Sequence, residues 1–229
     1  MIRPMAETTD APTPAAAVQP GTSKTPDLLQ YAQEQLKAKN DELARYCYAK
    51  ATRRDPFSIE AFYGLATASF RLGDLVGARG HYEKVESLDP LHAGAAANLG
   101  LVHYRLGDSE KGVSYLRRAI QLDPKRAEAY YNLGLVYRKQ GRVSLAIQMY
   151  QEAFRRNPRL VDAAFNLANI HFEAGELTLA KSFYQRVLEL APTFFRATVG
   201  LERIDRRMKN QVMAGPKATA KFVRRAAVR

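Results

Sequence analysis

The sequence predicts an all-α fold, a solenoid in which helical hairpins stack one on the next. The first observation behind this prediction is a repeat, because prolines and glycines recur every 34 residues along most of the 229-residue chain. The second is the apolar pattern between them, which has the 3.6-residue period of a helix. The recurring residues are Pro56, Pro90, Pro124, Pro158 and Pro192, and Gly73, Gly107, Gly141 and Gly175.

The apolar stripe of a first helix is clearest in residues 127–160. Positions 4, 7, 8 and 11 of this unit fall on one face of a helix. They hold Tyr130, Leu133, Gly134 and Tyr137. Glycine at position 8 and alanine at position 20 (Ala146) allow a second helix to approach closely, and the bulky Tyr150 fills the space beside them.

Each unit also carries the signals that end its two helices. Gly141 ends the first helix of this unit, because glycine reaches the left-handed conformation at little cost. Pro158 ends the second, because the residue before a proline avoids the helical conformation. A single hairpin leaves an apolar face uncovered, so neighbouring hairpins must stack. The five units are 25–58, 59–92, 93–126, 127–160 and 161–194.

The recurring residues resemble the tetratricopeptide repeat (TPR), in which aromatic-x-x-Leu-small-x-x-Tyr is followed by Gly, Ala, an aromatic residue, Ala and Pro. No unit has the tryptophan of that family, and the first unit has Lys39 where the others have glycine. The resemblance implies a right-handed solenoid with a concave groove for extended or helical peptides. The best-matching residues are Tyr130, Leu133, Gly134, Tyr137, Gly141, Ala146, Tyr150, Ala153 and Pro158.

Both ends of the chain depart from the repeat. Residues 195–211 begin a sixth unit in register but place Glu202 and Asp205 at inward positions, which predicts a solvent-facing capping helix. Residues 1–24 are rich in Ala, Thr and Pro and are expected to form a disordered leader. Residues 212–229 are expected to form a disordered basic tail.

The capping helix and the basic tail together account for much of the formal net charge of +12, since residues 195–229 contribute +8. Such a tail can bind nucleic acid, an anionic membrane surface or an acidic protein, or it can simply be solvated. Phe222 alone offers little surface for stacking, which favours the solvated tail. The basic tail residues are Lys217, Lys221, Arg224, Arg225 and Arg229.

The candidate binding residues lie on the face of each first helix that is opposite the core stripe. In the family that the sequence resembles, positions 2, 5, 9 and 12 line the concave groove. An unused row would be polar, whereas this one is largely aromatic. Part of it must pack against the neighbouring first helix, and the rest would take the side chains of a peptide. The candidate floor residues are Tyr63, Phe70, Tyr104, Tyr131, Arg138, Phe165, Asn169 and Phe172.

Position 6 holds asparagine in three successive units, as Asn98, Asn132 and Asn166. A carboxamide donates and accepts hydrogen bonds at once, so a ladder of them could hold a peptide backbone without reading its sequence. The pattern resembles the asparagine ladder in the repeat domain of O-linked N-acetylglucosamine transferases, although no transferase domain follows. Asparagine is also common at this position in the wider family, so a structural role is the alternative.

Position 13 holds lysine or arginine in the first four units. These side chains would either make one edge of the groove basic or interact with the negative ends of the helix dipoles. The residues of this basic edge are Lys37, Arg71, Arg105 and Lys139. Chaperone adaptors of the family clamp a terminal carboxylate with lysine at position 5 and asparagine at position 9 of their first unit. Here those positions hold Leu29 and Gln33, so that function is not predicted.

The histidines do not form a catalytic or metal-binding set. His103 and His171 occupy equivalent positions two units apart, His81 lies in a second helix and His92 in a turn. The glycines recur once per unit rather than as a phosphate-binding cluster. The single Cys47 is expected to be a small buried hydrophobe. We therefore predict no catalytic residues, no metal site, no cofactor and no enzyme activity.

The sequence as a whole predicts a protein–protein interaction scaffold or adaptor that binds a peptide segment of a partner, with no small-molecule substrate. No apolar run approaches the roughly 18 to 20 residues of a membrane helix, and no signal peptide is evident. These features predict a cytoplasmic protein without an integral membrane segment. Two alternatives stay open: a binder of nucleic acid or anionic membrane surfaces that acts through its tail, and a regulatory subunit of an enzyme or secretion complex.

Overall fold

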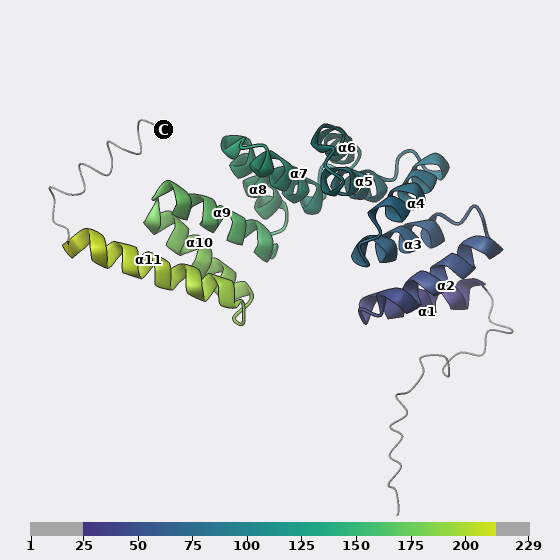
Figure 1. Ribbon diagram of the computed structural model, residues 1–229, viewed down its shortest axis with the longest axis horizontal. Coiled ribbons are helices and arrows are strands. Elements are labelled where there is room, and N and C mark those ends of the chain that lie inside the picture. Colours follow the sequence, from purple (N-terminus) through teal and green to yellow (C-terminus); the bar gives the residue numbers. More distant parts are fainter. Residues whose placement is uncertain (1–24, 214–229) are drawn as a thin grey trace, which may run out of the picture.

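The structure is a computed structural model that describes residues 25–213, and within this range it is all-α. Figure 1 shows its helices following one another along an open arc. The helices are α1 (Thr25–Lys37), α2 (Asp41–Arg54), α3 (Ile59–Arg71), α4 (Leu75–Leu88), α5 (Ala93–Arg105), α6 (Ser109–Leu122), α7 (Ala127–Lys139), α8 (Val143–Arg156), α9 (Val161–Ala174), α10 (Leu177–Leu190) and α11 (Phe195–Met213). The predicted leader, 1–24, and residues 214–229 of the predicted tail lie outside the described residues.

The first ten helices pair into five hairpins, one for each predicted unit. The two helices of a hairpin pack more closely against each other than against any other helix. The predicted stack of five hairpins with a capping helix is therefore confirmed. The capping helix α11 continues to Met213, two residues beyond the end predicted at 211. Helix ends are the least certain feature of a sequence-based prediction, because fraying and capping decide them.

The turn inside each hairpin has the left-handed residue that the glycines predict. Gly73, Gly107, Gly141 and Gly175 have φ between 72° and 93°. In the first hairpin the same place is taken by Lys39, which adopts φ 64°. A residue with a Cβ is strained in this conformation, so the first hairpin forms its turn at a cost that the others avoid.

Replacement of Lys39 by glycine should therefore stabilise the protein by about 1 kcal/mol, because glycine adopts a positive φ without the steric penalty. Chemical denaturation followed by circular dichroism would measure the change. Lys37→Gly is the matched control. Lys37 is the last residue of α1, where glycine brings no such relief. A Lys39→Gly variant that is no more stable than the parent would contradict this account of the turn.

Large rings on the second helices pack against the first helices. Tyr82, Tyr150 and Tyr184 are fully buried. The first helix approaches them closely, because a Cβ added at Gly134 would lie 2.7 Å from the Tyr150 ring. The third hairpin is different: Leu116 replaces the tyrosine, and a Cβ at Gly100 would lie 3.0 Å from the carbonyl oxygen of Gly112. The two backbones of that hairpin therefore touch.

The first helices of neighbouring units also contact each other, α1 with α3 and α5 with α7. Side-chain hydrogen bonds join α3 to α5 and α7 to α9. They therefore form a continuous layer along the stack. The capping helix α11 packs on α10 and reaches α9. It buries Ala197 and Ile204, while Glu202 and Asp205 are exposed, as the prediction of a solvent-facing cap requires.

Candidate functional site

The predicted floor residues lie along the first helices, and each keeps part of its side chain accessible. Tyr63, Phe70, Tyr104, Tyr131, Arg138, Phe165, Asn169 and Phe172 are all half-buried. The rings at position 5 pack partly inward, against tyrosines of the second helices. The ring centroids of Tyr131 and Tyr150 are 5.8 Å apart, and those of Phe165 and Tyr184 are 5.9 Å apart. One part of each ring therefore belongs to the core, and the other part forms an amphipathic surface.

The three asparagines at position 6 do not have equivalent surroundings. The amide nitrogen of Asn98 donates to two hydroxyl groups, that of Tyr63 at 3.0 Å and that of Tyr82 at 2.9 Å. Tyr82 also shares a hydrogen bond with Thr67 at 3.0 Å. Burial raises the pKa of Tyr82 well above its ordinary value, although the hydrogen bonds from Thr67 and Asn98 oppose the rise. Both N–H groups of Asn98 are thus used to join α5 to the preceding hairpin.

Asn166 is held in a similar way between α7 and α9. Its nitrogen donates to the Tyr131 hydroxyl at 3.3 Å, and its oxygen accepts from Arg138 at 3.2 Å. Arg138 also pairs with Glu173, with 2.8 Å between its guanidinium nitrogen and the carboxylate oxygen. The predicted groove residue Arg138 therefore connects two units.

Asn132 differs from both because its two expected partners are absent. Asn98 bonds to Tyr63 and Tyr82, which lie 35 and 16 positions before it. The residues 35 and 16 positions before Asn132 are Ala97 and Leu116, which have no hydroxyl group. Asn132 is only 8% exposed, and within residues 25–213 its side chain makes no hydrogen bond. Its amide still has some contact with solvent. Asn132 therefore has an unused donor and acceptor in the first-helix layer that are largely buried but not sealed from solvent.

Asn169 is the fourth asparagine among the predicted groove residues. Its oxygen accepts a hydrogen bond of 2.6 Å from the Tyr184 hydroxyl. This bond orients the amide, and its nitrogen, which has no hydrogen bond within the described part of the chain, is available as a donor.

Two residues of the predicted basic edge, Arg71 and Arg105, join neighbouring units. Arg71 donates to the carbonyl oxygen of Leu36 at 2.8 Å and pairs with Asp41 at 3.3 Å. The guanidinium carbon of Arg105 lies 4.5 Å from the centroid of the Phe70 ring. Both arginines thus reach back to the C-terminal end of the preceding first helix, where a cation is favoured by the helix dipole.

The other two residues of the basic edge, Lys37 and Lys139, are exposed. The same row continues into the capping helix with Arg207, which is not among the residues predicted from the sequence. Arg207 donates to the carbonyl oxygen of Phe172 at 3.1 Å, a contact equivalent to that of Arg71 with Leu36. Its place 34 residues after Glu173, within the register of the repeat, was the signal that could have found it.

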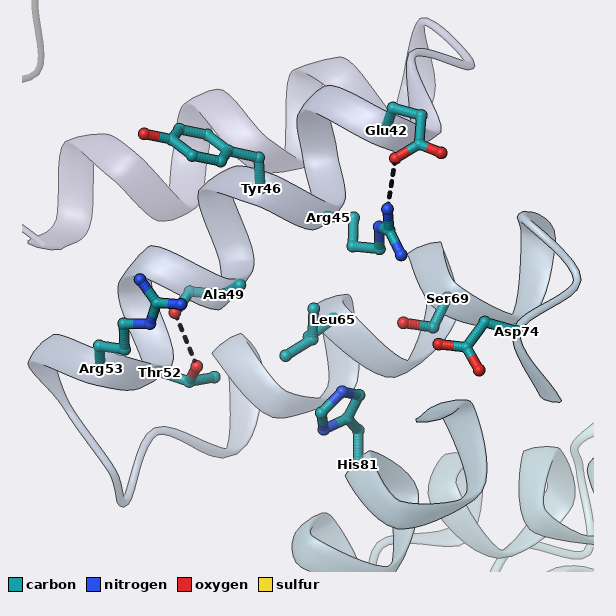
Figure 2. A pocket seen from close by; sticks show the side chains of 10 residues that line it. All are labelled: Glu42, Arg45, Tyr46, Ala49, Thr52, Arg53, Leu65, Ser69, Asp74 and His81. Atoms are coloured by element: carbon teal, nitrogen blue, oxygen red, sulfur yellow. Dashed lines mark hydrogen bonds and ion pairs between the residues drawn. The ribbon is translucent and has the colours of Figure 1, made fainter. Parts of the chain in front are cut away.

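A separate cleft of about 540 Å³ lies between α2 and α4, over α3 (Figure 2). Its polar groups are largely engaged: Arg45 pairs with Glu42 at 2.7 Å, and Asp74 accepts from the N–H of Gly77 at 2.8 Å. Burial lowers the pKa of His81, and the nearby Asp74 opposes this. The cleft contains none of the predicted groove residues. Its lining residues are Glu42, Arg45, Tyr46, Ala49, Thr52, Arg53, Leu65, Ser69, Asp74 and His81.

The side chains of His103, His171 and Cys47 are buried within the fold. His103 stacks on Tyr115, with ring centroids 5.4 Å apart, and its burial lowers its pKa. His171 lies 2.5 Å from the carboxylate of Glu176. Cys47 is buried, as predicted, and burial raises the pKa of its thiol. Among residues 25–213, no group of histidine, cysteine, aspartate or glutamate has the arrangement of a metal site.

The predicted tail residues Lys217, Lys221, Arg224, Arg225 and Arg229 lie outside the described part of the chain. Within that part, none of the helices is both long enough and apolar enough to span a membrane.

A family model and several solved structures match the chain. A family model described as Tetratricopeptide repeat matches residues 32–93, 97–158 and 131–193. No curated protein matches the chain. Among solved structures, PilF of Pseudomonas aeruginosa is 23% identical with a TM-score of 0.71, and the match covers 83% of this chain and 86% of that one.

Two further solved structures share the fold. A thermophilic TPR protein of Thermus thermophilus is 22% identical with a TM-score of 0.69, covering 79% of this chain and 98% of that one. YrrB, described as a TPR protein with an unusual peptide-binding site, is 19% identical with a TM-score of 0.55, covering 78% of this chain and 92% of that one. These likenesses establish the stack of hairpins as the common architecture.

Proposed function

Because the chain belongs to the tetratricopeptide repeat family, we propose that it is a scaffold or adaptor that binds a peptide segment of a partner protein along its first helices. Members of this family generally mediate protein–protein interactions. In this proposal the half-buried aromatic row forms the floor for apolar side chains, and the protein has no catalytic activity of its own.

The observation that carries the proposal is the unused amide of Asn132. A buried polar group without a partner costs about 1–3 kcal/mol, so such groups are normally satisfied within a fold. Asn98 and Asn166 are satisfied through their tyrosine partners. Asn132 has no such partner, and its amide avoids the full penalty because it is not sealed from solvent. A carboxamide that reaches the surface can accept from one peptide N–H and donate to one peptide C=O. An extended peptide backbone presents both groups, whatever its side chains are.

The surroundings of Asn132 suit an extended peptide for a second reason. Tyr131 precedes it and Leu135 follows it by one helical turn, and both are half-buried. Burial of apolar side chains on such a surface supplies the binding energy, at roughly 25 cal/mol for each Å² removed from water. The amide then sets the register of the backbone.

A phage-displayed library of random 12-residue peptides, selected on the immobilised full-length chain, tests this proposal. Affinities of the selected peptides would be measured by fluorescence anisotropy. We expect Asn132→Ala to weaken them by at least about tenfold, equivalent to about 1.4 kcal/mol. Gln148→Ala is the matched control, because Gln148 is an exposed amide on the second helix α8. Selected peptides that bind both variants as tightly as the parent would contradict the proposal.

A further inference from the structure

The capping helix α11 presents a stripe of three arginines to the end of the first-helix layer. Arg196, Arg203 and Arg207 are spaced by seven and four residues, so they share one face of the helix. The guanidinium carbon of Arg196 lies 5.1 Å from the centroid of the Phe165 ring. Those of Arg203 and Arg207 lie 4.6 Å and 5.5 Å from the centroid of the Phe172 ring. The stripe therefore lies over two of the predicted floor residues.

The arginine stripe carries positive charge that the fold does not neutralise. Within residues 25–213, no ion pair joins any of the three arginines to a carboxylate. The two acids of α11 are engaged elsewhere: Glu202 with Arg206 at 3.5 Å, and Asp205 with Lys181 at 3.2 Å.

Two acids of α9 lie near the stripe. Glu173 is paired with Arg138 at 2.8 Å. Asp162 is exposed in the first turn of α9. Burial raises the pKa of Tyr131; the charge of Asp162 adds to this rise, and the charge of Arg196 opposes it. With one of these acids already neutralised by Arg138, the three arginines leave an excess of positive charge at this end of the layer.

Stacking on aromatic rings prepares these arginines to bind a carboxylate. A guanidinium that lies over a ring uses its face for that contact and keeps the N–H groups at its edge free for bidentate hydrogen bonds. The ring also limits the side chain to fewer conformations, so less entropy is lost on binding. Arg207 has one N–H committed to the carbonyl oxygen of Phe172. The free amide nitrogen of Asn169 adds a neutral donor beside Phe172 on α9.

We propose that the arginine stripe, Arg196, Arg203 and Arg207, is the docking site for an acidic segment of the partner protein, rich in aspartate or glutamate. This inference rests on the proposed function and assigns a charge to the bound peptide. The stripe spans about 16 Å of helix, the length of about five extended residues. Several charge-assisted hydrogen bonds can form over that length.

A nucleic acid is the competing ligand for a basic surface, and the rings argue against it. Proteins that bind single strands offer open aromatic faces on which bases stack. Here the guanidinium groups of Arg196, Arg203 and Arg207 already cover the faces of Phe165 and Phe172. The surface therefore suits carboxylates better than bases.

The test uses the full-length chain and three fluorescein-labelled probes: a peptide of six Glu-Ala repeats, its uncharged Gln-Ala counterpart, and a 12-nucleotide oligothymidine. We expect the glutamate peptide to bind at least tenfold more tightly than the glutamine peptide. The triple variant Arg196→Gln, Arg203→Gln and Arg207→Gln should remove that difference. Arg203→Gln alone should weaken binding of the glutamate peptide severalfold. This single variant keeps the hydrogen bond of Arg207, so it tests the proposal even if the triple variant fails to fold.

The matched control removes three charges from the basic tail, as Lys217→Gln, Lys221→Gln and Arg224→Gln, and should change the affinity less than threefold. The inference is overturned if the tail variant abolishes binding, if both stripe variants bind the glutamate peptide like the parent, or if the oligothymidine binds more tightly. If library-selected peptides bind through Asn132 but the glutamate peptide does not bind, the acidic docking site is refuted and the proposed function is not. Absence of any Asn132-dependent peptide would instead refute the proposed function.

Discussion

Replacement of Leu133 by alanine should lower the free energy of unfolding by about 2–5 kcal/mol. Leu133 is 3% exposed and belongs to a cluster in which α7 meets residues of the hairpins before and after it, including Leu116 and Leu167. Removal of the side chain leaves a cavity at a junction of three units. Because the stability of a solenoid is approximately the sum of its units and the contacts between neighbours, the loss affects units on both sides. Urea denaturation followed by helical circular dichroism would measure it.

Leu179→Ala is the matched control for this prediction. It makes the same chemical change on α10, where Leu179 is 43% exposed, and should alter stability by less than about 0.5 kcal/mol. Equal effects of the two substitutions would mean that the stripe of the first helices does not form the core.

Asn98→Ala should destabilise the protein by about 1–3 kcal/mol, because it removes both donors that join α5 to the tyrosines of the second unit. Asn132→Ala should change stability by less than about 0.5 kcal/mol, since no hydrogen bond within the described chain is lost. The same substitution at equivalent positions of adjacent units would thus separate a structural asparagine from one that is free to bind. Thermal denaturation of the two variants provides the measurement. Similar melting temperatures would contradict the assigned difference.

The periodicity of the sequence was sufficient to predict the architecture. Helix ends, hairpin turns and the apolar stripe depend on residues within one unit, so Gly141 and Pro158 could be interpreted from local geometry alone. The close approach of Gly134 to Tyr150 followed from the same alternation of small and large residues. Even the exception at Lys39 was visible as a departure from glycine, although only the structure shows that the chain keeps the left-handed turn there.

The roles of individual groove residues could not be predicted in the same way. Asn98, Asn132 and Asn166 are identical in the repeat register, but their partners lie in other units. Ala97 and Leu116 remove those partners for Asn132 alone. Predicting this difference requires knowing which positions meet across the interface between units.

The arginine stripe was missed for a related reason. The capping helix was interpreted from the acids Glu202 and Asp205, which explain why the stack ends there. Arg196, Arg203 and Arg207 have the spacing of one helical face, and this spacing was available from the sequence. Only the packing of α11 against α9 shows that this face lies over Phe165 and Phe172.

Photo-crosslinking of a library-selected peptide tests most directly whether the first helices bind a peptide. A photoreactive phenylalanine analogue would replace Tyr104, a half-buried residue of the first-helix row, or Gln148, an exposed residue of the second helix α8. We expect the peptide to crosslink to the analogue at 104, an excess of unlabelled peptide to suppress the product, and no crosslink to form at 148. Crosslinking at 148 but not at 104 would contradict binding along the first helices, because the peptide would then lie on the second helices.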